Sequence, residues 1–250
     1  MTDQLSLLLE TDLPNLPDGV RPMQPRPLPQ PFDSATHLFE PSWGGLRALA
    51  FVGPAAAPGR GEVRLVDADG HDVGGALPEL AGLAVRVDAR SAVLDGELVV
   101  VDAHGRADGP ELARRIGGRA GRPVAFLAFD LLHLDGRSLL STPLTRRRQL
   151  LRRVLRPGDE VVAVPAIPLE GRALFDAVVA QGIAGVMARE SASPYLPGVR
   201  SRLWRFIAAS PANAKAALDA SGAEEPPFEG PANGPVLALI RRLPLLDEDE

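Results

Sequence analysis

Apolar residues in the middle of the chain recur in short runs separated by polar turns, a pattern typical of β-strands. The first run is residues 46–52 (LRALAFV), and the next, residues 62–73, contains Asp-Ala-Asp-Gly, the turn chemistry of a hairpin. Residues 92–105 and 124–136 are apolar runs that each close with a Gly-bearing turn. Residues 183–210 predict a strand, a turn and a further strand. These runs predict mostly antiparallel sheets.

A helical period of apolar positions separates the strand-like runs. It predicts helices over residues 109–118, 141–158 and 170–182. For residues 141–158 we predict Thr142 as the N-cap and Pro143 as the first helical residue. Strands interleaved with helices and hairpin turns predict an α+β fold.

The polar face of the 141–158 helix is rich in arginine, with Arg146, Arg147, Arg148, Arg152 and Arg153. A solvated face and a DNA contact are the alternative interpretations of such a cluster. We expect the solvated face, which is the usual role of a charged run on a helix.

The two ends of the chain differ from its middle in residue composition and in apolar pattern. Residues 1–20 are predicted as an N-terminal tail, and the Pro-rich segment up to about residue 33 as extended chain. Residues 21–208 form the predicted folded unit. Residues 209–250 predict a helix, a linker and an acidic tail, whose apolar positions could dock onto this domain or onto another protein.

Composition narrows the chemistry. The chain has no cysteine, which excludes disulfides, zinc–thiolate sites and cysteine nucleophiles. Lys215 is the only lysine, so a Walker P-loop is excluded, and the four histidines show no metal-ligand spacing. We therefore predict no metal site. The net charge of −5 argues against a dedicated nucleic-acid binder, although a local basic face remains compatible with it.

Targeting signals are not evident in the sequence. The first residues carry acidic groups where a signal peptide has a basic segment, and the longest apolar run there is Leu7 to Leu9. No stretch approaches the roughly 18 apolar residues of a membrane span. We expect a cytoplasmic protein that does not bind a membrane.

Six short blocks occur in a distinctive order: RPM at residues 21–23, EPSWGGLR at 40–47, DGE at 95–97, FDLL at 129–132, AGVMAR at 184–189 and SPYLPGVRSRLW at 193–204. In this order and spacing, the chain resembles the adenylation (nucleotidyltransferase) domain of ATP-dependent DNA ligases, especially the bacterial kind associated with end-joining repair. The resemblance extends from about residue 21 to residue 208.

The resemblance implies a DNA-ligase-like nucleotidyltransferase (ATP-grasp-like) fold with antiparallel sheets flanked by helices. It also implies ATP and Mg²⁺, which nothing else in the sequence supports. In the family an OB-fold domain follows and closes over ATP and DNA. Only 42 residues follow residue 208, so we expect no OB-fold domain and weak or no DNA binding by this chain alone.

Several family positions carry different residues here. In the family the lysine of the first block attacks the α-phosphate of ATP; its position is Ser42, whose hydroxyl is a far weaker nucleophile without an activating base. The remaining departures are Gly44 for the aspartate of that block, Ala184 for a metal-binding glutamate, Arg189 for a lysine, and Phe206 and Ala208 for the lysines of the final block.

Other family positions are retained. The resemblance assigns Glu40 to the adenine edge, Arg47 to the ribose or phosphate, Glu97 to the ribose or metal, and Phe129 to the stacking face of the base. With Arg189, these are the vestigial nucleotide-binding residues. Structural roles are the alternative, because Phe129 could be a core residue and Arg47 could simply pair with Glu97.

Three hypotheses follow. The first is a catalytically inactive domain that serves as a scaffold or regulatory partner, with DNA-repair proteins as the expected partners. The second is an active ATP-dependent DNA ligase, which would need Lys215 or another substitute nucleophile. The third is a sensor that binds adenine nucleotides without chemistry. A sensor needs a cleft that is polar around Glu97 and open beside Phe129. A cleft filled by Trp43, Phe206 or Met187 would count against it.

Overall fold

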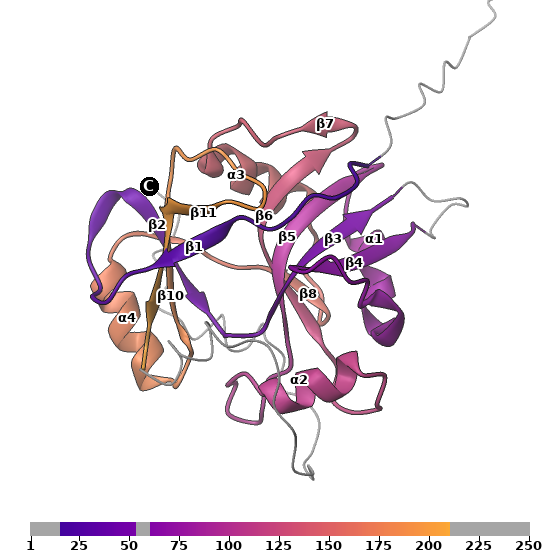
Figure 1. Ribbon diagram of the computed structural model, residues 1–250, viewed down its shortest axis with the longest axis horizontal. Coiled ribbons are helices and arrows are strands. Elements are labelled where there is room, and N and C mark those ends of the chain that lie inside the picture. The colour runs from indigo at the N-terminus through magenta and orange to yellow at the C-terminus, as the bar shows by residue number, and fades with distance from the viewer. Residues whose placement is uncertain (1–15, 54–60, 211–250) are drawn as a thin grey trace, which may run out of the picture.

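The computed structural model describes residues 16–53 and 61–210 (Figure 1). Two β-sheets form its framework. The predictions for residues 1–15 and 211–250, including Lys215 and the acidic tail, lie outside the described residues. Among the helices of the described ranges, none combines the length and the apolar character that crossing a membrane requires.

The longer strands of the larger sheet come from the predicted apolar runs. Its strands occur in the order β4-β3-β5-β6-β7, with β8 pairing on β6. All pairs are antiparallel except β6 with β8. Their bounds are β3 Leu46–Val52, β4 Val63–Asp67, β5 Ala92–Val99, β6 Ala125–Leu134, β7 Arg137–Ser138 and β8 Val161–Ala163. The strand predictions for residues 46–136 are thus confirmed.

The second sheet has the order β1-β11-β10-β2-β9, and only the β1–β11 pair is parallel. Its strands are β1 Gln24–Pro27, β2 Ser34–Ser42, β9 Ile167–Leu169, β10 Gly185–Glu190 and β11 Arg200–Ala208. The extended Pro-rich segment supplies β1, an edge strand, where the missing N–H groups of Pro25 and Pro27 can be tolerated. Strand β2 is absent from the sequence prediction.

Four α-helices complete the described fold: α1 Leu83–Arg86, α2 Gly109–Ile116, α3 Leu144–Val154 and α4 Gly171–Ala180. Two 3₁₀ turns, Gly74–Ala76 and Pro78–Gly82, precede α1. The side chain of Asp108 accepts a hydrogen bond from the backbone N–H of Glu111 and caps α2.

The predicted start of α3 is wrong by one residue. Pro143, with ψ 142°, is the N-cap, and the helix begins at Leu144 without a side-chain cap. This extended ψ places Pro143 just outside the helix, so Thr142 lies too far from the first free N–H groups to cap them.

The core of the described residues consists of three apolar clusters, two of which take residues from both sheets. Leu151 and Leu155 pack with Phe126 of the larger sheet. Leu174 and Val178 of α4, which lies beside the smaller sheet in Figure 1, belong to a second cluster that takes residues from both sheets, such as Val186 and Leu127. Where the sheets meet, a third apolar cluster takes residues from both: Met23, Leu49, Phe51, Val66, Val93, Leu132, Met187, Tyr195 and Trp204. The two sheets are therefore one packed unit.

Candidate functional site

The retained family residues come together where the two sheets face each other. Met187 lies opposite Glu40 on one side and opposite Phe206 on the other. Arg189 lies two positions further along β10, opposite Trp204. Opposed residues of an antiparallel pair share a face and side chains alternate along a strand, so this set occupies one face of the smaller sheet. Phe129, on the larger sheet, contacts this set of residues through Arg189.

Glu40 holds two arginines. Its Oε1 accepts a hydrogen bond of 2.6 Å from Arg148 Nη1, and its Oε2 accepts one from Arg189 Nη1. Only 1% of the Glu40 residue is exposed. Both carboxylate oxygens are thus engaged by guanidinium groups of the chain itself, and such charge-assisted contacts are among the stronger hydrogen bonds in proteins.

The ring of Phe129 is covered by guanidinium groups. Arg189 Cζ lies 4.0 Å from the ring centroid, and Arg47 Cζ lies 4.5 Å from it. Both distances suit cation–π contacts. Phe129 is 5% exposed, so its ring is a buried surface instead of an open stacking face.

Arg47 pairs with Asp95, which corrects the expected pairing with Glu97. Arg47 Nε donates to Asp95 Oδ1 at 2.6 Å and Nη2 donates to Oδ2 at 2.5 Å. Burial disfavours the charge, but Asp95 outweighs it, and the pKa of Arg47 is raised. Arg47 and Glu97 do lie opposite each other across β3 and β5. Arg47 pairs with Asp95, its diagonal neighbour across the two strands, because backbone N–H groups already bind the Glu97 carboxylate.

Glu97 binds the connection between β2 and β3. It accepts hydrogen bonds from the backbone N–H of Gly45 at 2.5 Å and of Trp43 at 3.3 Å. Burial raises the pKa of Glu97, and these hydrogen bonds act in the opposite direction. Glu97 therefore fixes the loop that follows Ser42, a structural use of the carboxylate.

Four of the six positions at which the family resemblance implies other residues lie in one corner of the site. Ser42 ends β2 opposite Gly185. A Cβ atom added to Gly44 would lie 2.9 Å from the Cβ of Ala184, and one added to Gly185 would lie 2.8 Å from the Phe206 ring. We call Ser42, Gly44, Ala184 and Phe206 the vacated corner. By the family resemblance, these four positions would carry an amine, two carboxylates and a further amine.

The arginines of α3 correct a second expectation. Arg147 is 0% exposed and Arg148 is 3% exposed, whereas Arg146, Arg152 and Arg153 are exposed. The prediction of a solvated face is thus wrong for Arg147 and Arg148. The cause is an acid within β6: Arg147 Nε and Nη2 each donate to an oxygen of Asp130 at 2.8 Å, and Nη1 donates to the carbonyl of Ser193 at 3.0 Å.

Sequence reasoning missed this buried network of Asp95, Asp130, Arg147 and Tyr195. Tyr195 belongs to it because its hydroxyl donates to Asp95 Oδ2 at 2.7 Å and accepts from the N–H of Met23 at 2.9 Å. A signal was present: Asp95 and Asp130 lie within apolar strand sequences, and a buried acid needs cationic or hydrogen-bonding partners.

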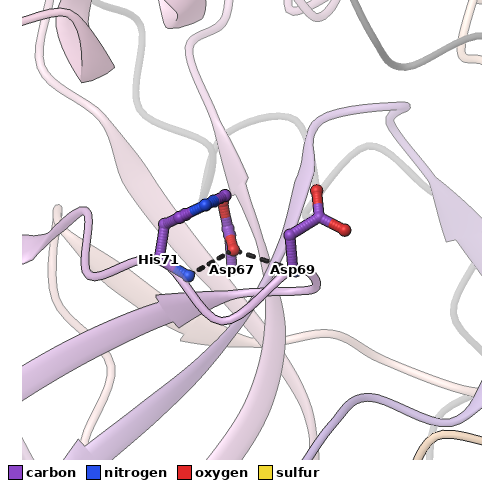
Figure 2. A group of neighbouring side chains, drawn as sticks. All are labelled: Asp67, Asp69 and His71. Carbon is purple, nitrogen blue, oxygen red and sulfur yellow. Dashed lines mark hydrogen bonds and ion pairs between the residues drawn. The ribbon is translucent and has the colours of Figure 1, made fainter.

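A separate polar group lies on the hairpin after β4, where Asp67, Asp69 and His71 gather (Figure 2). Asp67 Oδ1 accepts from the backbone N–H groups of Asp69 at 2.9 Å and His71 at 2.8 Å. His71 Nδ1 lies 3.2 Å from Asp67 Oδ2. These are the hydrogen bonds of an Asx-type turn, which account for the arrangement without an ion.

Comparisons with known proteins identify the family of this chain. The model of the family described as ATP dependent DNA ligase domain matches residues 35–206. The multifunctional non-homologous end joining DNA repair protein LigD of Mycobacterium tuberculosis (strain ATCC 25618 / H37Rv) is 37% identical over 166 residues, which are 66% of this chain and 21% of LigD. A probable DNA ligase of Sorangium cellulosum is 34% identical over 203 residues, 74% of this chain and 37% of that protein.

Solved structures give the same result. A structure titled mycobacterial DNA ligase D complexed with ATP and MES has a TM-score of 0.63 at 32% identity, covering 76% of this chain and 60% of that one. The ligase domain from M. tuberculosis LigD has a TM-score of 0.61 at 33% identity, covering 75% and 60%. The matched part of this chain spans between 20% and 37% of the length of its curated relatives. By its sequence and its fold, the chain belongs to the ATP-dependent DNA ligase domain family.

Proposed function

We propose that this chain is a catalytically inactive adenylation domain that serves as a scaffold or regulatory partner in DNA repair. The vacated corner is the observation that carries the proposal. The chemistry of this family needs an amine at position 42, where this chain has Ser42. Gly44, Ala184 and Phe206 lie in the same corner, and none of these side chains carries a charge. Loss of the nucleophile alone can cost on the order of 10⁶ in rate.

Several changed positions in contact support inactivity more strongly than one. A Ser42→Lys change alone would leave Gly44 and Ala184 in place, and the 2.9 Å approach between their Cβ positions leaves little room for an acid at residue 44. Restored chemistry would then need several simultaneous substitutions. This arrangement favours a domain whose role depends on its surface and its stable fold and not on catalysis.

The nucleotide-sensor hypothesis is less well supported. It needs an open face on Phe129, but the ring contacts Arg47 and Arg189 and is 5% exposed. These guanidinium groups cover the ring, and Trp43 lies in the same buried apolar cluster as Phe129.

The expected partners are proteins of DNA repair, by analogy with relatives named as non-homologous end joining proteins. The chain carries a net charge of −5, which is unfavourable for holding DNA without help. We infer weak or no DNA binding by this chain alone, action in the cytoplasm and no membrane partner.

A nick-sealing assay tests the proposal. The full chain is incubated with ATP, Mg²⁺ and a duplex that carries one nick and a labelled strand, beside a LigD ligase domain as positive control. We expect no sealed strand above the protein-free blank. Sealing that depends on ATP would overturn the proposal and favour the active-ligase hypothesis.

A further inference from the structure

Four arginines gather at the edge of the smaller sheet where β1 and β11 lie side by side (Figure 1). Arg26 of β1 lies opposite Arg205 of β11, and Arg200 and Arg202 come earlier on β11. Arg205 is half-buried and the other three are exposed. Within the described residues none of the four takes part in an ion pair, and Arg200 Nη1 donates to the carbonyl of Pro25 at 3.0 Å. We call these four arginines the basic strip.

The basic strip is turned away from the place where the two sheets meet. Leu203 and Trp204 pack in the apolar cluster between the sheets. Neighbouring side chains on a strand point to opposite faces, so Arg202 and Arg205, which flank these two residues, point away from that cluster.

One acid lies near the basic strip. Glu190 lies opposite His37 across β10 and β2. Burial lowers the pKa of His37, Glu190 raises it and Arg205 lowers it, so both charges act on the same half-buried ring. A single nearby carboxylate against four guanidinium groups leaves the strip with an excess of positive charge.

The opposite charge is present in the same chain. Residues 211–250 carry eight acidic and three basic residues, a net charge of −5 that equals the net charge of the whole chain. Residues 243–250 (LPLLDEDE) join a short apolar run to four consecutive acids. The basic strip has the matching pair of features, because Val199, directly before Arg200, is 47% exposed.

We propose that the acidic segment 243–250 docks on the basic strip of its own chain. Its carboxylates bind Arg200, Arg202 and Arg205, and its leucines cover Val199. A docked segment also closes the strip to other polyanions. The inference does not depend on the proposed function, because no residue of the basic strip belongs to the vacated corner.

The length of the chain suits this contact. Strand β11 ends at Ala208, and Arg200, at its other end, lies about 26 Å away at roughly 3.3 Å per residue. A flexible chain as long as residues 211–246 spans about 30–36 Å on average, which covers that distance. Exposed ion pairs are individually weak, but a tether gives the segment an effective concentration on the order of millimolar. Docking within one chain is therefore favoured over docking between chains.

A spin label on the acidic segment tests the proposal in the full chain. The chain has no cysteine, so Pro244→Cys supplies a single site for a nitroxide label, which weakens the amide NMR signals of residues close to it. We expect the amide signals of Arg200, Arg202 and Arg205 to lose about half of their intensity or more at low salt, because tethering populates even a weak contact. Salt at about 1 M, which shortens the Debye length to about 3 Å, should restore these signals.

Matched arginine pairs make the test specific. Arg200→Gln/Arg202→Gln should abolish the signal loss along β11, whereas Arg152→Gln/Arg153→Gln, which changes two exposed arginines of α3, should preserve it. The inference is overturned if the label causes no loss at β11 or if the two pairs behave alike. Equal loss in an isotope-labelled chain caused by a label on a separate copy also overturns it, because the occupant is then a second copy. The proposed function fails on a different readout, sealed DNA from the wild-type chain.

Discussion

Replacing Arg147 with methionine is expected to lower the free energy of unfolding by about 3–5 kcal/mol, the range for breaking one side of a buried ion pair. The change leaves Asp130 in a site where both residues are 0% exposed. It also removes the donor to the carbonyl of Ser193. Urea denaturation at neutral pH measures the loss.

The control is Arg146→Met, one residue earlier on α3. Arg146 is exposed and contacts Gln149, so we expect a change within about 0.5 kcal/mol. Burial raises the pKa of Asp130 even beside Arg147. Without the cation the pKa rises further, so the deficit of Arg147→Met should be largest at neutral pH and shrink as falling pH protonates Asp130. Equal stability of the two variants would contradict the buried pair.

A methyl group at Gly45 should destabilise the fold by about 3 kcal/mol, the upper end of ordinary overpacking. A Cβ atom there would lie 2.0 Å from the carbonyl oxygen of Leu98 and 2.7 Å from Val99 Cγ1. The backbone must move to relieve this contact, which also disturbs the hydrogen bond from Gly45 to Glu97. Thermal denaturation of Gly45→Ala tests the prediction.

Gly75→Ala is the matched control, because a Cβ atom at Gly75 meets nothing within 4 Å. Its unfolding free energy should change by no more than about 0.5 kcal/mol. If both alanine variants melted at the wild-type temperature, the close approach of the β2–β3 connection to β5 would be wrong.

Much of the fold could be predicted from local pattern. Alternating apolar runs identified β3 to β6, β10 and β11, because these strands are long and lie in buried sheets. Strand β2 was missed since Pro41 and the polar residues Ser34 and Thr36 obscure its alternation. Its identity as a strand comes from its pairing with β10, a long-range contact that local sequence does not contain.

The candidate site could be predicted only as a set of positions. Family blocks identified Glu40, Arg47 and Phe129, which the structure brings together. They did not reveal the partners. Arg189 and Glu40 are 149 residues apart in the sequence. Arg47 pairs with Asp95, its diagonal neighbour, because of the register between the two strands. Partner choice of this kind is decided by tertiary packing.

The residues that hold the fold differ from those the family needs for chemistry. Asp95, Asp130 and Arg147 are buried and paired, and they keep their partners whatever stands at position 42. The vacated corner contributes no ion pair within the described residues. The ion pairs that hold this fold are therefore independent of the vacated corner.

The most direct test of the account is the intact mass of the wild-type protein after incubation with ATP and Mg²⁺. Covalent transfer of AMP to the protein is the first step that the family resemblance implies, and its detection needs no DNA substrate. We predict an unchanged mass, because Ser42 replaces the amine nucleophile. A mass increase of one AMP unit would contradict the account, and peptide mapping would then identify the residue that accepts it.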